Sequence, residues 1–412
     1  MKNTGKTSYP KEKIKILLLE GIHPRAKKHF NSLGYKNVEL LKSSLSEDEL
    51  ITRLKDVHLL GIRSKTQVTK KVIDSSKKLL GIGCFCIGTN QVEMSAAMNN
   101  GIAVFNAPFS NTRSVAELVI AEIILLKRNL IDKIRAAHDG KWYKDASGSH
   151  EVRGKTLGII GYGHIGSQVS VLAENLGMKV IFYDAEPKLS MGNAVPVKNM
   201  DELLKNSDIV TLHVPGTTST KNMISKKELS KMKKGAILIN LSRGDVIVEK
   251  DVIAALKSKR LAGLALDVFA KEPKSNNEKF VSAYQGLNNV VLTPHIGGST
   301  IEAQEAIGAD VSLNLGGFLE NGSTVGSLTV PALNIPVQEN AHRILHIHKN
   351  VKGVLSNINT TLSKLNINIL GQYLKTNEDI GYVVLDLDKT ATSKVKSALE
   401  QVPNTVRVRS LY

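Results

Sequence analysis

Residues Lys155–Gly166 read KTLGIIGYGHIG, an apolar strand that runs into three spaced glycines and then into a helix-compatible stretch, residues 167–176. Gly161 permits a tight turn, Gly163 lets the backbone approach a pyrophosphate, and Gly166 lets the helix pack closely on the strand. The N-terminus of such a helix offers free N–H groups to phosphates. The stretch therefore predicts a dinucleotide-binding unit at the centre of an α/β fold.

The residues after this unit indicate which dinucleotide binds. Residues 179–183, KVIFY, read as the next strand and end at Asp184, roughly 20 residues beyond the glycines, where the fingerprint needs an acidic residue. A carboxylate there accepts hydrogen bonds from a ribose diol and repels a 2′-phosphate, and no arginine follows in residues 185–187. These features favour NAD over NADP, and they disfavour a glycine turn in an unrelated α/β protein.

The size and charge of the chain limit its class. With 412 residues the chain exceeds the size of a single core, so we expect two or three domains. The formal net charge of +17 could indicate a nucleic-acid partner, but the lysines are scattered along the chain and only 4% of the residues are aromatic. We interpret the charge as a composition bias on solvated faces and expect no nucleic-acid partner.

Several stretches bear on the compartment. The first thirteen residues are polar and charged, without the apolar segment of a signal peptide. The longest apolar stretch, residues 115–126, is short for a membrane span and contains two glutamates. Cys84 and Cys86 stand too close together for an unstrained disulfide, and no His or Cys cluster accompanies them as metal ligands. We expect a cytoplasmic protein with buried thiols, no metal and no membrane contact.

Charged residues follow predicted strands at their carboxyl ends. Residues 14–108 alternate between apolar strands and helices, which predicts a parallel sheet, and Arg63-Ser64-Lys65 follow the strand at 59–62. Ligands of such sheets bind at the carboxyl ends of the strands. These three residues are thus candidates for substrate binding, and a solvated loop is the alternative.

Three further residues with useful chemistry each follow a different strand in the second half of the chain. Arg243 follows the strand at 236–240, Glu272 the strand at 261–266, and His295 the strand at 290–292. Each alone could be an ordinary loop residue. On one shared sheet edge they provide a cationic fork for a carboxylate, an imidazole for acid/base work, and a carboxylate that raises the imidazole pKa.

Two other segments define the organisation of the chain. Residues 110–126 predict a helix that is apolar on most faces, which indicates burial between domains or between subunits. Residues 324–336 read as a linker, and strands and helices alternate after residue 340 in the order βαββαβ of the split ferredoxin-like motif.

With these motifs assembled, the chain resembles the three-domain D-3-phosphoglycerate dehydrogenases of the D-isomer-specific 2-hydroxyacid dehydrogenase family. The resemblance runs from about residue 14 to the end and rests on eight stretches: GIRSKTQVT, GCFCIGTNQVEMSAA, APFSNTRSVAELVI, GYGHIG, NLSRGDVI, ALDVFAKEP, TPHIGGST and GQYLKTNEDIGYVVLDLD. It implies two Rossmann-like doubly wound parallel-sheet domains and a C-terminal ferredoxin-like ACT domain. The implied boundaries are a polar tail at 1–13, a substrate domain at 14–108 and 299–333, an NAD domain at 109–298 and an ACT domain at 340–412.

The resemblance also implies roles for individual residues. The catalytic set is Arg243, Glu272 and His295. Contacts to NAD are implied for Gly161, Gly163, His164, Ile165, Gly166, Asp184, Leu241, Ser242, Arg243, Asp267, His295, Ile296, Gly297 and Gly298. Contacts to the substrate are implied for Arg63, Ser64, Lys65, Asn111, Arg243 and His295, with Lys42, Lys65 and Lys144 as cations for its phosphate. Lys65 stands where the family commonly has a second arginine, which replaces a bidentate fork by a point charge.

In the ACT domain the resemblance implies a serine effector site at His348, Asn350 and Asn368. The Arg-Pro of the family's loop is Val351-Lys352 here, so we expect a less rigid loop, and a purely structural assembly domain is the alternative. A homo-oligomer, a tetramer or a dimer, is also expected.

The implied reaction is the NAD-dependent oxidation of 3-phospho-D-glycerate to 3-phosphohydroxypyruvate, the first step of phosphorylated serine biosynthesis, with feedback by serine. A side reduction of 2-oxoglutarate to 2-hydroxyglutarate is a further expectation. Two alternatives stay open at this point: a glyoxylate or hydroxypyruvate reductase with the same three catalytic residues, and a non-enzymatic NAD-sensing protein.

Overall fold

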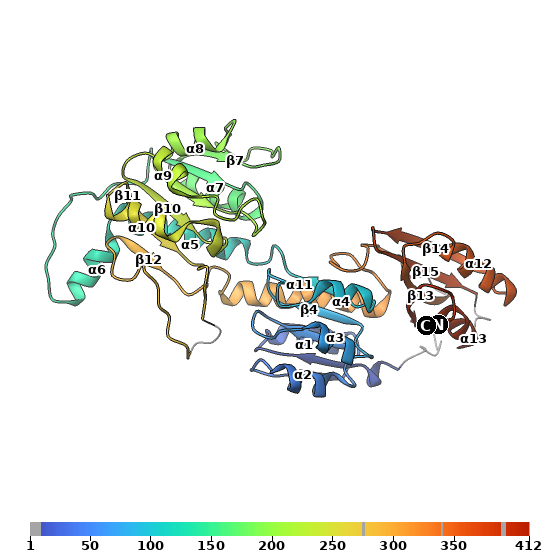
Figure 1. Ribbon diagram of the computed structural model, residues 1–412. Coiled ribbons are helices and arrows are strands. Elements are labelled where there is room, and N and C mark those ends of the chain that lie inside the picture. The colour runs from blue at the N-terminus through green and yellow to red at the C-terminus, as the bar shows by residue number, and fades with distance from the viewer. Residues whose placement is uncertain (1–9, 274–276, 339–340, 389–392, 412) are drawn as a thin grey trace. The chain divides into compact units, whose positions relative to one another are not determined.

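A computed structural model describes residues 10–273, 277–338, 341–388 and 393–411 (Figure 1). The described chain divides into two compact units. Unit 1 comprises the described residues of Met1–Ser110 and Gln304–Tyr412, and unit 2 comprises those of Asn111–Ala303.

Unit 1 opens with a five-stranded parallel sheet in the order β2-β1-β3-β4-β5. Helices α2, α3 and α4 cover one face, and α1 with most of α11 covers the other, so the central strands are buried on both sides. The bounds are η1 Lys11–Lys13, β1 Lys15–Leu18, α1 Pro24–Ser32, β2 Asn37–Leu40, α2 Glu47–Leu54, β3 Leu59–Ile62, α3 Lys70–Ser75, β4 Gly81–Cys84, α4 Met94–Asn99, β5 Ala103–Asn106 and α11 Ile301–Glu320.

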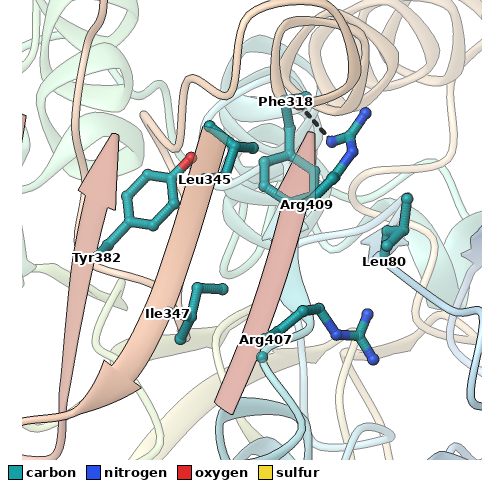
Figure 2. A pocket seen from close by; sticks show the side chains of 8 residues that line it. Leu80, Phe318, Leu345, Ile347, Tyr382, Arg407 and Arg409 are labelled. Carbon is teal, nitrogen blue, oxygen red and sulfur yellow. Dashed lines mark hydrogen bonds between the residues drawn. The ribbon is translucent and has the colours of Figure 1, made fainter. Parts of the chain in front are cut away.

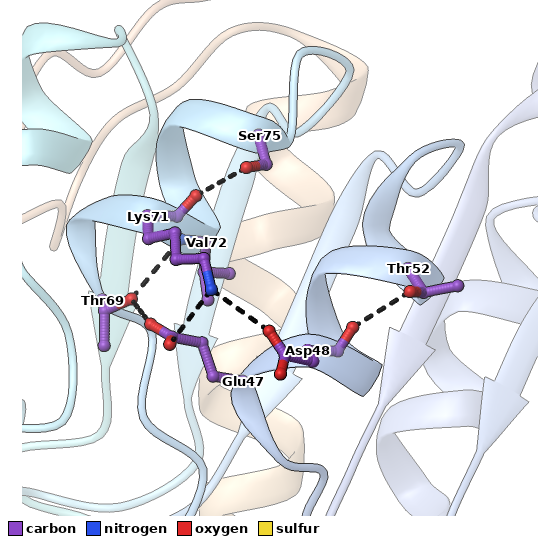
Figure 3. Close-up of polar contacts among 7 residues, drawn as sticks. All are labelled: Glu47, Asp48, Thr52, Thr69, Lys71, Val72 and Ser75. Atoms are coloured by element: carbon purple, nitrogen blue, oxygen red, sulfur yellow. Dashed lines mark hydrogen bonds and ion pairs between the residues drawn. The ribbon is translucent and has the colours of Figure 1, made fainter.

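Polar contacts on the surface join α2 to α3 (Figure 3). The Glu47 carboxylate accepts a hydrogen bond from Thr69 Oγ1 at 2.5 Å, and Lys71 Nζ lies 3.1 Å from an Asp48 oxygen. Thr69 also caps α3 by accepting from the backbone N–H of Val72. The start of α3, which follows the loop of Arg63 to Lys65, is therefore tied to α2.

Unit 2 is a seven-stranded parallel sheet in the order β12-β11-β10-β9-β6-β7-β8. The strand order reverses at β6, the position at which open α/β sheets bind ligands. The bounds are α5 Thr112–Lys127, α6 Leu130–His138, β6 Thr156–Ile160, α7 His164–Asn175, β7 Lys179–Tyr183, β8 Val195–Pro196, α8 Met200–Asn206, β9 Ile209–Leu212, α9 Lys226–Lys231, β10 Ala236–Asn240, η2 Gly244–Val246, α10 Glu249–Lys257, β11 Leu261–Leu266 and β12 Val290–Leu292.

The C-terminal part of unit 1 is an antiparallel sheet in the order β14-β15-β13-β16. Its chain order is βαββαβ, which confirms the predicted ferredoxin-like motif. The bounds are β13 His342–Lys349, α12 Val354–Lys364, β14 Ile369–Thr376, β15 Ile380–Leu387, α13 Ser393–Glu400 and β16 Thr405–Ser410.

The two faces of this sheet have different partners. Ile344, Val383 and Leu385 pack under α12 and α13, whereas the alternate residues join the core of the N-terminal sheet. On that second face Arg409 donates to the Phe318 carbonyl oxygen at 3.0 Å (Figure 2). It also donates to the Leu319 carbonyl oxygen at 2.8 Å, and Arg407 donates to the Leu79 carbonyl oxygen. Both arginines thus anchor β16 to backbone at the end of α11 and before β4.

Two predictions about the whole chain can be compared with this structure. Cys84 and Cys86 are free thiols; Cys84 is buried as expected, whereas Cys86 is only partly buried. Desolvation raises the pKa of Cys86 to about 11. Among the described residues, none of the helices has the length and apolar character needed to cross a membrane.

Candidate active site

The glycine turn at the end of β6 contains two closely packed glycines, Gly161 and Gly166, and one glycine, Gly163, that faces open space. Gly161 has a φ of +91°, and a Cβ there would lie 2.3 Å from the His213 carbonyl oxygen. A Cβ on Gly166 would lie 2.2 Å from the Gly161 carbonyl oxygen. A Cβ on Gly163 would have no described heavy atom within 4 Å. The backbone at Gly163, just before the N-terminal turn of α7 at His164 and Ile165, therefore fits the close approach of a pyrophosphate.

Asp184 follows β7 directly and faces this turn. Its Oδ2 accepts from the Tyr162 backbone N–H at 2.7 Å, and its Oδ1 accepts from the Glu186 backbone N–H at 3.0 Å. An ionised carboxylate has about four acceptor positions, so two remain for the hydroxyls of a ribose. The residues of the turn and Asp184 together fit the adenosine half of NAD.

His295 and Glu272 form a hydrogen-bonded pair. His295 Nδ1 lies 2.9 Å from Glu272 Oε2, and because a carboxylate only accepts, Nδ1 carries the proton. This hydrogen bond raises the pKa of His295 above its ordinary value. Burial alone would raise the pKa of Glu272, but the hydrogen bonds from His295 and from the Phe269 backbone N–H hold it below its ordinary value. The pair is a histidine with Nε2 left for a proton and a carboxylate that stabilises the charged ring.

Asp267 holds the segment that carries His295. It is 2% exposed, and its carboxylate accepts from Thr293 Oγ1 at 2.6 Å, from the Ile296 N–H at 2.8 Å and from the Gly297 N–H at 2.8 Å. His295 lies between these anchors with a φ of +55°, a left-handed conformation that is rare outside glycine. Sequence reasoning did not identify Thr293; its position directly after β12 was the available signal.

Arg243 stands on a turn that Asn240 organises. The fully buried Asn240 accepts from the Ser242 N–H at 3.0 Å and from Ser242 Oγ at 2.8 Å, and its Nδ2 donates to the Arg243 carbonyl oxygen at 2.9 Å. A Cβ on Gly244 would lie 2.0 Å from the Phe269 carbonyl carbon. The turn of Arg243 therefore packs against the segment of Glu272, and sequence reasoning missed both Asn240 and Gly244 as the cause.

The structure thus brings Arg243, Glu272 and His295 to one edge of the unit 2 sheet, at the carboxyl ends of β10, β11 and β12. The positive charge of Arg243 acts against the rise in the His295 pKa. A cation, a general base and its supporting carboxylate are the groups needed to hold a 2-hydroxy acid and remove its hydroxyl proton.

Of the other residues predicted for unit 2, Leu241 and Ser242 directly precede Arg243, and Ile296 directly follows His295. Leu241 and Ser242 are buried, whereas Ile296 is 42% exposed. Asn111, at the start of α5, packs so closely that a Cβ on Gly298 would lie 2.2 Å from its Nδ2. Its buried Oδ1 has no hydrogen-bond partner among the described residues. Lys144 is exposed in the segment after α6.

The residues predicted for unit 1 lie at the carboxyl edge of its sheet. Lys42 follows β2, and Arg63, Ser64 and Lys65 follow the neighbouring strand β3. Arg63 is half-buried, and Lys42, Ser64 and Lys65 are exposed.

The residues predicted for the effector lie at two ends of the C-terminal sheet. His348 is buried, its Nδ1 lies 2.7 Å from the Lys349 carbonyl oxygen, and its Nε2 has no partner in the described chain. Asn350 follows it and donates to the Asn377 carbonyl oxygen at 2.6 Å. Asn368 instead lies beside Asp388, at the far end of β15 from Gly381, the partner of His348. One chain therefore does not bring the three residues together.

A doubly wound NAD-binding sheet that carries this histidine, glutamate and arginine defines the class of D-2-hydroxyacid dehydrogenases. Residues 120–297 match the model of the "D-isomer specific 2-hydroxyacid dehydrogenase, NAD binding domain", and residues 344–407 match an "AHAS small subunit-like ACT domain". A similar solved structure is D-lactate dehydrogenase from Aquifex aeolicus complexed with NAD and lactic acid, with a TM-score of 0.66, 26% identity, and coverage of 77% of this chain and 100% of that chain.

Curated relatives narrow the class. D-3-phosphoglycerate dehydrogenase of Haemophilus influenzae is 50% identical over 409 residues, which cover 99% of this chain and 100% of that protein. The Dictyostelium discoideum enzyme of the same name is 50% identical over 98% of this chain and 99% of that protein. The chain belongs to the D-3-phosphoglycerate dehydrogenase family. The predictions of an NAD-dependent dehydrogenase, of its Rossmann fold and of an ACT domain are thereby confirmed.

Proposed function

We propose that the chain oxidises 3-phospho-D-glycerate to 3-phosphohydroxypyruvate with NAD, the first step of phosphorylated serine biosynthesis. The observation that carries this proposal is the 2.9 Å pair of His295 Nδ1 and Glu272 Oε2 on the NAD-binding sheet. The curated relatives named D-3-phosphoglycerate dehydrogenase support the choice of substrate.

Each residue of the edge has a part in the proposed mechanism. The Arg243 guanidinium binds the substrate carboxylate, and Nε2 of His295 accepts the proton of the C2 hydroxyl. Glu272 stabilises the imidazolium that forms. When bound, NAD accepts the hydride that leaves C2. Gly161, Gly163, Gly166 and Asp184 hold the adenosine and pyrophosphate, and Asp267 keeps the His295 segment in place through its three accepted hydrogen bonds.

The phosphate of the substrate is assigned to the cations of unit 1. Arg63 and Lys65, with Ser64, stand at the carboxyl end of β3, and Lys42 follows the neighbouring strand. No ion pair joins Lys42, Arg63 or Lys65 to a carboxylate within the described ranges. Three such cations suit a dianion. Asn111 and Lys144 are proposed to contribute further contacts to the substrate.

Replacing His295 by glutamine tests the mechanism. The variant keeps a side chain of similar reach but loses the titrating nitrogen, so kcat should fall by about 10²–10⁴-fold. Binding of NAD, followed by isothermal titration calorimetry, should persist. Turnover within a few-fold of the unchanged enzyme would contradict the role of His295. In the same assays, reduction of 2-oxoglutarate at a measurable rate would support the proposed side activity.

We further propose that serine binds at the ACT domain between two copies of the chain. Strand β14 is an edge of its sheet, and antiparallel pairing of two copies of β14 would bring the Asn368 end of one next to the Thr376 end of the other. Thr376 pairs with Gly381, which pairs with His348, so each Asn368 would approach the other copy's His348. The buried, unpartnered Nε2 of His348 supports a polar ligand there.

Serine at millimolar concentration should then inhibit the enzyme, and Asn368→Ala should weaken inhibition more than turnover. Unchanged inhibition in Asn368→Ala would contradict the proposed site, and the absence of any inhibition would favour a purely structural ACT domain.

The remaining assignments are also proposals. The predicted boundaries, 14–108 with 299–333, 109–298 and 340–412, are kept as those of the substrate, NAD and ACT domains. A homotetramer or dimer is supported by the exposed Trp142 and Tyr143, at 88% and 64%, and by the free edge of β14. The cytoplasm is supported by the free thiols of Cys84 and Cys86.

A further inference from the structure

Glu20 has an unusual place in unit 1. It follows β1, it is 9% exposed, and its φ is +61°, so a side chain with a Cβ stands in the left-handed region. Such a conformation is costly for residues other than glycine and asparagine, and where it persists it often serves a functional site. The conformation of Glu20 therefore indicates that its side chain has a specific role.

The Glu20 carboxylate accepts hydrogen bonds from three backbone N–H groups of one loop. Oε1 accepts from the backbone N–H of Arg63 at 3.2 Å and of Thr66 at 2.8 Å, and Oε2 accepts from the backbone N–H of Lys65 at 3.0 Å. Gln91 secures the other side of the loop, because its Nε2 donates to the Arg63 carbonyl oxygen at 2.7 Å. The backbone of Arg63–Thr66 is thus held from two directions by side chains more than twenty residues away.

The backbone of the same turn joins the loop of the other neighbouring strand. The Glu20 N–H donates to the Ser43 carbonyl oxygen at 3.1 Å, and the Gly21 N–H donates to the Leu41 carbonyl oxygen at 2.9 Å. Because β1 lies between β2 and β3, this turn fixes Lys42 on one side and Arg63 and Lys65 on the other. The far end of the β3 loop is tied separately, through Thr69 and Glu47 (Figure 3).

The charge of Glu20 argues that its role is geometric. A carboxylate close to a phosphate site repels the ligand, so charge alone would favour a neutral residue here. A carboxylate, however, offers only acceptors, and three backbone N–H groups converge on it. A glutamine would turn an NH₂ group toward at least one of these donors.

We propose that Glu20 is a positioning residue that holds the Arg63–Thr66 loop in the conformation that binds the phosphate of the substrate. The inference rests on the proposed function, since it presumes that Arg63 and Lys65 meet a phosphate. It assigns Glu20 a part in selecting phosphorylated over unphosphorylated 2-oxo acids without contact to the reacting atoms.

The direction of the change in KM for the phosphorylated substrate tests the proposed role of Glu20. In the reduction direction, with NADH, Glu20→Gln should raise KM for 3-phosphohydroxypyruvate by about ten-fold, the effect expected for losing a hydrogen bond to a charged acceptor. KM for hydroxypyruvate, KM for NADH and kcat should each stay within about two-fold, because the pair of His295 and Glu272 is untouched. A purely electrostatic role predicts the opposite, a lower KM for the phosphorylated substrate.

Two further variants complete the design. Glu20→Asp keeps the charge but shortens the reach, so it should also raise KM for 3-phosphohydroxypyruvate, and it carries the test if Glu20→Gln does not fold. Glu39→Gln removes the same charge from β2, where the carboxylate pairs with the exposed Arg53, and should leave KM unchanged. An unchanged or lowered KM in both Glu20 variants, or an equal loss for both substrates, overturns the inference. A wild-type enzyme that does not prefer the phosphorylated substrate overturns the proposed function instead.

Discussion

Replacing Glu272 by glutamine examines the pair of His295 and Glu272, on which the proposed chemistry depends. In the wild type the hydrogen bond and negative charge of Glu272 raise the pKa of His295. Glutamine keeps the shape but loses the charge, so the pKa of His295 should fall toward its ordinary value. A hydrogen bond to a charged group contributes about 1.5–3 kcal/mol, or roughly 10- to 150-fold in rate. Because the two side chains are 55% and 35% exposed, solvent screening places the expected loss of kcat at the lower end, about 10- to 30-fold.

The direction of the pH change follows from the chemistry. Oxidation needs the neutral ring, so its rate rises with pH through the pKa of His295, and in Glu272→Gln this rise should move to lower pH. Reduction needs the protonated ring, so its rate falls with rising pH, and in the variant this fall should also begin at lower pH. Both profiles can be recorded as kcat by NADH absorbance.

A matched control comes from α10. Glu249→Gln removes an exposed carboxylate that makes no hydrogen bond to His295, and neither pH profile should shift. If both pH profiles of Glu272→Gln stay in place, or shift to higher pH, the pairing with Glu272 does not set the ionisation of His295 and the reasoning is refuted.

Three further predictions concern separate parts of the chain. Gly163→Ala should leave the melting temperature unchanged and weaken NAD binding by at least about ten-fold in calorimetric titration. Gly166→Ala should unfold at lower temperature because its Cβ would lie 2.2 Å from a backbone oxygen. Equal behaviour of the two variants would contradict the account of the turn. Asp386→Ala should lower the free energy of unfolding, measured in urea, by about 3–5 kcal/mol, because it leaves the fully buried Arg343 without its bidentate partner. The double variant Arg343→Met with Asp386→Leu should recover most of that loss. A double variant no more stable than Asp386→Ala would contradict this explanation. Lys65→Arg should lower KM for the phosphorylated substrate by roughly two- to five-fold, since a guanidinium can bind two phosphate oxygens, and a raised KM would argue against Lys65 as a phosphate ligand.

Much of the fold was predictable because its strands are short, apolar and followed by turns. The strands predicted at 236–240, 261–266 and 290–292 coincide with β10, β11 and β12. Their carboxyl ends meet at one edge by the topology of a parallel sheet, so Arg243, Glu272 and His295 could be grouped before any coordinates were known.

Helix α11 was not predicted, for a physical reason. It contains Gly308 and Gly316, which disfavour a helix in isolation. In the structure both lie against α1 and its flanks: a Cβ on Gly308 would be 3.3 Å from His23, and one on Gly316 would be 2.8 Å from Leu33. The glycines permit close packing between distant segments, which the local sequence does not reveal.

The hydrogen bonds that support the site escaped prediction, although Asp267 itself was expected as a contact to NAD. Asn240, Asp267 and Glu20 act through hydrogen bonds to backbone N–H or carbonyl groups of loops, and in Glu20 the partners lie more than forty residues away. A sequence pattern displays the side chains that meet a ligand, but it does not display which buried carboxylate or amide holds them.

The most direct measurement of the central claim compares wild-type turnover, with NADH, of 3-phosphohydroxypyruvate, 2-oxoglutarate and glyoxylate under identical conditions. The account predicts the highest kcat/KM for the phosphorylated acid, because the phosphate contacts proposed for the β3 loop would add to the carboxylate binding proposed for Arg243. A kcat/KM for 2-oxoglutarate or glyoxylate that equals or exceeds it would contradict the account and assign the same catalytic pair to another D-2-hydroxyacid dehydrogenase reaction.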